Sequence, residues 1–90
     1  MSLTQAITLS ADLIQRRQDL LRLFGEARYQ ERTALAKERI REVMALQKEG
    51  NPISAAIAYC KHLAAQHPGE DVSTTQQFVL AAAADLAEGK

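Results

Sequence analysis

Cysteine and histidine are the residue types in this chain best suited to bind a metal ion, and three of them lie close together. Cys60, His62 and His67 fall within eight residues, and Glu70 and Asp71 follow them. On a helix, however, Cys60 and His62 would point about 200° apart. No two of these residues have the paired C-x₂-C or H-x₃-H spacing of zinc sites. We therefore expect no metal ion and no other cofactor.

The same residues could in principle serve catalysis, with Cys60 as a nucleophile. A nucleophilic thiol must be exposed and must have a base within reach. Cys60 instead falls on the apolar stripe of its predicted helix, where cysteines are usually inert. The carboxylate pairs Glu38/Glu42 and Glu70/Asp71 lie on a charged helix face and in a polar loop, where solvated charges are the simpler explanation. All four glycines are isolated, so no phosphate-binding loop is present. We expect no catalytic residues and no enzyme activity.

A helix, a short turn and a second helix extend from Arg41 to His67. The stretch Gly50-Asn51-Pro52-Ile53-Ser54-Ala55-Ala56-Ile57 is similar to the helix-turn-helix of phage small-terminase proteins. That resemblance implies a regulator that binds nucleic acid through residues 48–61, with help from Arg39 and Arg41. DNA binding needs several cations to neutralise phosphates. The second helix offers only four polar side chains that could contact bases, namely Ser54, Tyr59, Lys61 and His62. DNA binding is therefore the alternative hypothesis.

The same hairpin also resembles a tetratricopeptide repeat. Gly50, Ala55, Tyr59 and Pro68 lie near the glycine, alanine, aromatic and proline positions of that repeat. Pro68 is one position late, and the preceding helix lacks the tryptophan and the Leu-Gly pair. No second copy follows at a period of about 34 residues. We therefore assign the chain to neither family.

The composition favours helices throughout. Apolar residues make up 47% of the 90 residues, sixteen residues are alanine, and there is no tryptophan. Alanine is the best helix former, whereas strands are enriched in β-branched and aromatic residues, which are sparse here. Apolar periodicity predicts helices at 4–24, 26–49, 52–66 and 74–88. The predicted fold is a single all-α domain spanning residues 1–90, a small antiparallel bundle of three to four helices.

Glycine, proline and capping residues mark the predicted boundaries. Gly25 either ends the first helix or lies within one long helix, and the sequence leaves both alternatives open. Gly50, Asn51 and Pro52 suit the positions after one helix end and at the start of the next helix. Ser73 with Gln76 has the spacing of a capping box, which predicts the start of the last helix.

Charge and cysteine content limit the partners and the compartment. Eleven basic and eleven acidic residues give no net charge. The halves differ only slightly, since residues 1–49 carry nine basic and seven acidic side chains. Such a balance does not indicate nucleic acid or a membrane surface. The single cysteine excludes an internal disulfide and fits a reducing compartment. Because residues 1–10 also lack the basic and apolar regions of a signal peptide, we expect a cytoplasmic protein.

The last predicted helix is apolar on almost every side, which indicates either burial on several sides or a surface that meets another protein. This feature favours a non-enzymatic protein–protein interaction module, such as an adaptor, a chaperone-like protein or a regulator. Its partner would be another protein or a second copy of the chain, and we expect self-association as a dimer. The predicted interface residues are Leu20, Leu23, Phe24, Phe78, Val79, Leu80 and Leu86. An ordinary intramolecular core is an equally good explanation for them, because a helical bundle must be filled.

Overall fold

Four helices pack against one another in the computed structural model. It describes the backbone of residues 3–48 and 50–89 and the side chains of residues 11–48 and 50–89. The helices are α1 (Leu3–Phe24), α2 (Glu26–Gln47), α3 (Pro52–Gln66) and α4 (Ser73–Ala87). The described residues form no strand. The prediction of a small all-α bundle is therefore confirmed.

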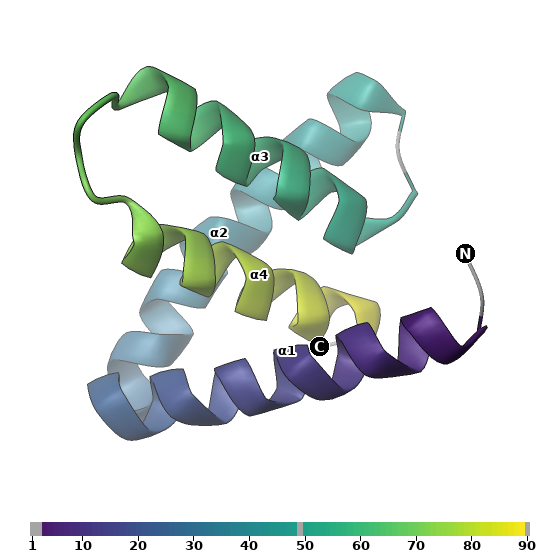
Figure 1. Cartoon of the computed structure of the whole chain (residues 1–90), viewed down its shortest axis with the longest axis vertical. Coiled ribbons are helices and arrows are strands. Elements are labelled where there is room, and N and C mark those ends of the chain that lie inside the picture. Colours follow the sequence, from purple (N-terminus) through teal and green to yellow (C-terminus); the bar gives the residue numbers. More distant parts are fainter. Residues whose placement is uncertain (1–2, 49, 90) are drawn as a thin grey trace.

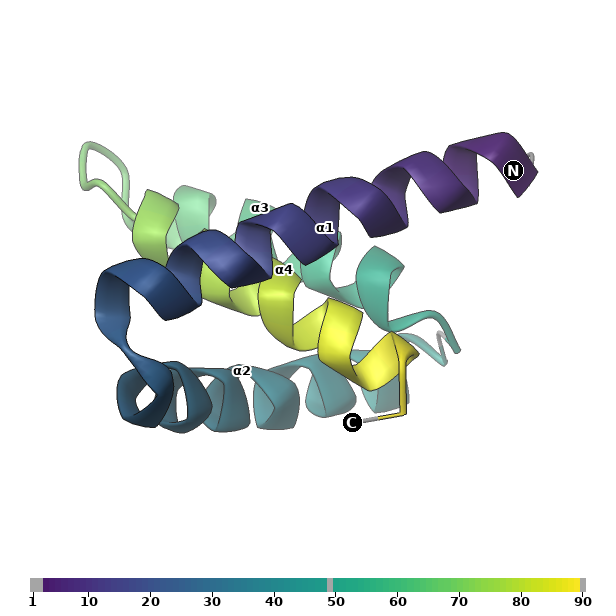
Figure 2. The same ribbon diagram turned by 90° about the horizontal axis from the view of Figure 1, so that it is seen from below.

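Helix α4 occupies the middle of the bundle. It packs against each of the other three helices, whereas the described residues show no close backbone approach between α1 and α3. Figure 1 shows α4 between α3 and α1, with α2 crossing behind them. Figure 2, seen from below, shows α1 and α2 on opposite sides of α4. The most C-terminal of the four helices is thus the common support of the other three.

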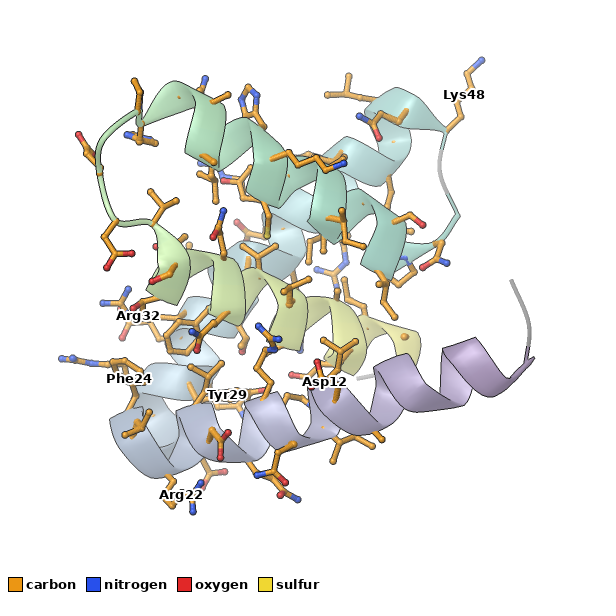
Figure 3. The ribbon with its side chains drawn as sticks, in the orientation of Figure 1. Asp12, Arg22, Phe24, Tyr29, Arg32 and Lys48 are labelled. Carbon is orange, nitrogen blue, oxygen red and sulfur yellow. The ribbon has the colours of Figure 1, made fainter. Side chains whose placement is uncertain are left out.

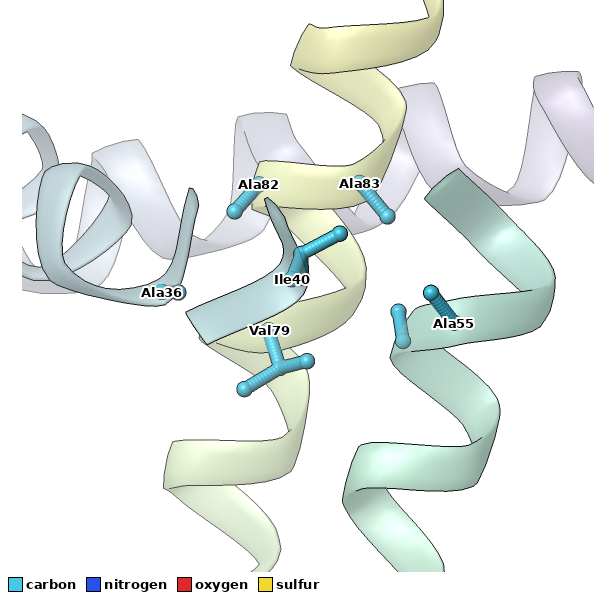
Figure 4. Close-up of a cluster of buried hydrophobic side chains, with 7 residues drawn as sticks. Ala36, Ile40, Ala55, Val79, Ala82 and Ala83 are labelled. Atoms are coloured by element: carbon cyan, nitrogen blue, oxygen red, sulfur yellow. The ribbon is translucent and has the colours of Figure 1, made fainter. Parts of the chain in front are cut away.

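The main core explains why α4 is apolar on almost every side. Ile40 of α2 and Val79 of α4 are its largest side chains, and both are fully buried. Alanines from three helices complete this core, so the helix backbones approach closely (Figure 4). The buried residues of this cluster are Ala36, Ile40, Ala55, Ala56, Val79, Ala82 and Ala83. The apolar faces of α4 are accordingly covered by the chain itself.

A second, aromatic core joins α1 and α2 to the first half of α4. Leu20, Tyr29, Phe78 and Ala81 are buried there, with Phe24 packed against them. The rings of Phe24 and Phe78 meet edge to face with centroids 5.2 Å apart, a favoured aromatic geometry. This cluster fixes the end of α1 against α4.

Gly25 separates α1 from α2 and forms the whole connection between them. Its backbone has φ 84° and ψ 159°, a conformation that is essentially restricted to glycine. Its N–H donates to the carbonyl of Leu21 at 2.9 Å, and its own carbonyl accepts from Tyr29 N–H at 3.0 Å. The alternative in which Gly25 ends the first helix is therefore the one observed.

The turn from α2 to α3 confirms one predicted cap and changes another. The Asn51 side chain accepts hydrogen bonds from the backbone N–H groups of Ile53 and Ser54, and Pro52 opens α3. Gly50 was expected in the left-handed position after α2, but Lys48 takes that position with φ 53°. Helix α2 thus ends at Gln47 rather than at the predicted residue 49.

The start of α4 also differs from the prediction. The capping box of Ser73 and Gln76 does not form, and the Asp71 carboxylate instead accepts from the Ser73 N–H at 3.0 Å and the Ser73 hydroxyl at 2.6 Å. Gln76 turns toward α3, where its side-chain amide donates to the Cys60 carbonyl at 3.1 Å. Tertiary contact between α3 and α4 therefore outweighs the local pattern at Gln76.

Helix α1 carries two neighbouring apolar rows, and the bundle buries only one of them in the described part. Leu13 and Leu20 are buried, whereas Ile14 and Leu21 are 40% and 37% exposed.

Among the described residues, no helix is long and apolar enough to cross a membrane.

Candidate functional site

A buried polar network connects α1, α2 and the end of α4. Asp85 is 7% exposed, and its carboxylate accepts from Arg17 Nη1 at 2.6 Å and from the Tyr29 hydroxyl at 3.1 Å. Arg17 also donates from both guanidinium nitrogens to the two carboxylate oxygens of Glu88, at 3.0 and 2.6 Å. Figure 3 shows Tyr29 between α1 and α4.

Neighbouring groups in this network raise the pKa values of Arg17 and Tyr29. Hydrogen bonding to Glu88, and then to Asp85, raises the pKa of Arg17 above its ordinary value. Burial, followed by the charge of Asp85, raises the pKa of Tyr29, so the phenol remains a neutral donor. No buried side-chain nitrogen or oxygen of the described residues lacks a hydrogen-bond partner. The network joins three helices through these hydrogen bonds.

A groove lies on another side of the molecule, where α2 diverges from α3 beside the first turns of α4. It has a volume of about 230 Å³, which is smaller than the roughly 300–1,000 Å³ of typical ligand pockets. Its size therefore suits single side chains of a partner better than a cofactor. We call it the arginine groove, and its lining residues are Arg32, Leu35, Ala36, Arg39, Tyr59, Thr75, Phe78 and Val79.

The arginine groove combines an apolar floor with two cations. Phe78 and Val79 are buried beneath it, and Leu35 at its rim is 62% exposed. The guanidinium of Arg32 lies 5.7 Å from the centroid of the Phe78 ring, a cation–π distance. Figure 3 shows Arg32 at the same end of the molecule as Phe24. None of the lining residues is acidic, so the groove favours an anionic partner group.

The exposed side of α2 next to this groove carries an ordered pattern of charge. At about 100° per residue, three arginines fall on one side of Leu35 and three glutamates fall on the other. Of these three arginines and three glutamates, only Arg39 and Glu42 form an ion pair with a described residue, and it joins the two to each other at 3.2 Å. We call this surface the charged face of α2, and its residues, all exposed, are Arg28, Glu31, Arg32, Leu35, Glu38, Arg39, Glu42 and Leu46.

Two further grooves are larger than the arginine groove. One, of about 420 Å³, lies between α1, α3 and α4 and is lined by Arg16, Cys60 and Lys61 among others. The other, of about 440 Å³, lies between α1 and α2 above the polar network. Its lining mixes both signs of charge, with Glu26 and Lys37 on α2. The first of these grooves, like the arginine groove, has two cations, Arg16 and Lys61, and no acidic residue in its lining, whereas the second is lined by both signs of charge.

The structure distributes the seven predicted interface residues between the core and the surface. Leu20, Phe78 and Val79 are buried inside the chain. Three others, Phe24, Leu80 and Leu86, are partly buried and pack against the two cores. Leu23 is the exception, because it is 76% exposed. Most of this set therefore packs within the chain. Two further leucines on α2, Leu35 and Leu46, are 62% and 85% exposed and were not among the predicted interface residues.

Of the residues considered for metal binding or nucleophilic chemistry, the structure brings His67 and Glu70 together. Burial raises the pKa of the Cys60 thiol, which donates to the Gln76 carbonyl with Sγ and oxygen 3.7 Å apart. His67 lies beside Glu70, with 3.3 Å between Nδ1 and Oε2. Within the described ranges, no three histidine, cysteine, aspartate or glutamate side chains are grouped so that they could hold a metal ion.

The second helix of the hairpin that resembles a helix-turn-helix presents little positive charge. Lys61 is the only lysine or arginine of α3, and it lies exposed next to His62. A recognition helix is usually supported by several phosphate contacts. The geometry of α3 therefore adds nothing in favour of DNA binding.

Comparison with known proteins gives no further indication of function, because no family model, curated protein or solved structure matches the chain. The functional argument accordingly depends on the arginine groove and the charged face of α2.

Proposed function

We propose that the protein is a non-enzymatic protein–protein interaction module that binds a helix of its partner along α2. The observation that carries this proposal is the exposed Leu35, which stands at the rim of the arginine groove between Arg32 and Arg39. An apolar anchor flanked by charged groups is a recurrent arrangement where one helix docks on another.

Enzyme activity has less support, because among the described residues the buried cluster of Arg17, Tyr29 and Asp85 has a structural explanation as a link between three helices. The alternative of a nucleic-acid-binding regulator is also less well supported, since the arginines of α2 are interleaved with glutamates. A phosphate backbone would meet both signs of charge on that face.

Site-specific photocrosslinking in living cells tests the proposal. A photoreactive amino acid placed at Leu35 is expected to crosslink to one defined protein partner. The matched control is the same amino acid at Lys61, an exposed position on the other side of the bundle, where we expect no such product. Replacing Arg32 and Arg39 together by glutamate should abolish the Leu35 product. Equal crosslinking at both positions, or none at either, would contradict the proposal.

A further inference from the structure

Gly25 joins two helices whose hydrogen bonding is nearly continuous. The Leu21 carbonyl accepts from the Gly25 N–H, and the Gly25 carbonyl accepts from the Tyr29 N–H, so the four-residue spacing of an α-helix is present immediately before and after the bend. Three bonds, from the N–H groups of residues 26–28 to the carbonyls of residues 22–24, separate this arrangement from one uninterrupted helix. No side chain caps the start of α2, so straightening supplies these N–H groups with helical acceptors.

The sequence around the bend also favours a helix. Glu26, Ala27 and Arg28 are good helix formers, and neither proline nor asparagine occurs in residues 22–28. A glycine inside a helix lowers the equilibrium constant for helix formation only about fivefold relative to alanine. No heavy atom lies within 4 Å of a methyl group placed at Gly25, so the described structure leaves the hinge open.

Straightening of the hinge would take α1 away from its own α4. Leu13 and Leu20 of α1 are buried, and Arg17 is held by Asp85 and Glu88. Exposing two leucines and separating a buried ion pair are both unfavourable. A straight chain therefore requires an identical surface for α1 elsewhere, and a second copy of this chain carries one.

We infer that the protein forms a domain-swapped dimer, in which α1 and α2 of each copy merge into one helix through Gly25 and each α1 packs on the partner's α4. Arg17 would then pair with the partner's Asp85, and Leu20 would lie against the partner's Phe78. Because the swapped contacts repeat those of the monomer, the hinge and the protein concentration decide which form is present. The charged face of α2 takes no part in the swap, so this inference does not depend on the proposed function.

Gly25→Ala tests the hinge. Alanine disfavours the bent backbone and favours the helix, so the two hinges of a dimer should together raise the dimer association constant at least about a hundredfold. Sedimentation equilibrium in the micromolar to millimolar range measures this constant. Gly50→Ala is the matched control and should leave it unchanged, because Gly50 lies outside the hinge and its φ is not left-handed. A folded Gly25→Ala variant that associates no more tightly than the unaltered chain would overturn the inference.

A distance within one chain distinguishes a swapped dimer from two bent chains that lie side by side. In a Cys60→Ala background, spin labels at Asp12→Cys and Leu46→Cys occupy exposed positions on α1 and α2. In one continuous helix the two positions are about 51 Å apart, which exceeds the dimensions of the monomer, 32 × 28 × 21 Å. Dimers prepared with an excess of unlabelled chain should show this long distance by pulsed electron paramagnetic resonance. Dimers that retain only the shorter distance of the monomer would contradict swapping.

Refolding of the labelled chain with Gly25 intact keeps the test independent of how stable the alanine variant is. Refolding from urea at millimolar concentration favours contacts between copies, so it should enrich the dimer and its long distance relative to refolding at micromolar concentration. Two glycines inserted after Gly25 lengthen the hinge and disfavour a continuous helix, so they should remove the dimer. Absence of the long distance after refolding at millimolar concentration would overturn the inference even if Gly25→Ala did not fold.

Discussion

Asp85 shows how a single buried carboxylate can organise this bundle. It lies in the alanine-rich α4 and receives hydrogen bonds from α1 through Arg17 and from α2 through Tyr29. Removing one member of a buried ion pair leaves the other charge without compensation. The sequence contains a signal for this role, because Asp85 interrupts an otherwise apolar run. Its partner Arg17 lies 68 residues away, and no local pattern connects the two.

Asp85→Ala is expected to lower the free energy of unfolding by about 3 kcal/mol, because Tyr29 and Arg17 both lose an acceptor in the interior. Arg17 keeps its two hydrogen bonds to Glu88, so the loss of unfolding free energy should stay below the largest values seen when a buried ion pair is broken. Urea unfolding followed by circular dichroism measures the change. The matched control is Asp12→Ala, which removes only an exposed pair with Arg16 and should cost less than about 0.5 kcal/mol. Equal losses in the two variants would contradict this role of Asp85.

Asp71 gives a prediction for the pH dependence of α4. Hydrogen bonds from the hydroxyl and the N–H of Ser73 hold the pKa of Asp71 below its ordinary value of 3.8. A carboxyl group with a lowered pKa in the folded state contributes stability above its unfolded pKa, and this contribution is lost as the pH falls through the folded value. An NMR titration should find the Asp71 midpoint below 3.8, and Ser73→Ala should raise it. A midpoint at or above 3.8 in the unaltered chain would show that the cap does not form in solution.

At the scale of helices, Gly25 determines the shape of the first half of the chain. A continuous helix from α1 into α2 would be about 65 Å long, and the two halves could not both pack against α4. The positive φ of Gly25 reverses the chain within one residue, so α1 and α2 reach opposite sides of α4 (Figure 2).

Gly25→Ala is therefore expected to destabilise the protein by about 1–3 kcal/mol, since alanine strongly disfavours this backbone conformation. No heavy atom lies within 4 Å of the added methyl group, so backbone strain is the whole effect. Gly50→Ala is the control, because its φ lies outside the left-handed region and its surroundings are equally open. We expect the control to be neutral or to stabilise by up to about 1 kcal/mol. Thermal and urea unfolding of both variants measure the difference.

The helix boundaries could be predicted from the sequence to within about two residues, because proline, asparagine and glycine act locally. The predicted capping box at Ser73 is not observed, because the Gln76 side chain donates to the Cys60 carbonyl of α3 instead. Burial of α4 on several sides was one of the two explanations that the sequence left open, and the helices that cover it were not predicted. Helical periodicity places Leu35 among charged residues and away from the buried stripe of Tyr29 and Ile40, but the groove beside it depends on how α2, α3 and α4 pack, which is a tertiary property.

At the scale of the whole molecule, alanine makes close packing around α4 possible. Ala55, Ala56, Ala82 and Ala83 have no exposed surface, and the backbones of α3 and α4 approach across them (Figure 4). Small residues bury little area each, so the stability of this core depends on the absence of gaps.

Ala83→Leu is expected to destabilise the bundle by about 1–3 kcal/mol, because the larger side chain must push α3 away from α4. Ala87→Leu adds the same atoms at an exposed position on the same helix and should leave stability within about 0.5 kcal/mol of the original. Urea unfolding of the two variants provides the comparison. Tolerance of leucine at Ala83 would indicate a looser core than the structure shows.

The central position of α4 also bears on how the chain folds as it is synthesised. A ribosome releases α1, α2 and α3 before α4, and at about 5–20 residues per second these helices emerge without the element that they all contact. Among the described residues the backbones of α1 and α3 do not approach each other closely, so the core around α4 cannot form before α4 emerges. Folding is thus expected to wait for the alanine-rich segment 78–84 and then to proceed in a single step. During that interval, chaperones on the ribosome would be able to bind the exposed apolar faces of the unfinished chain.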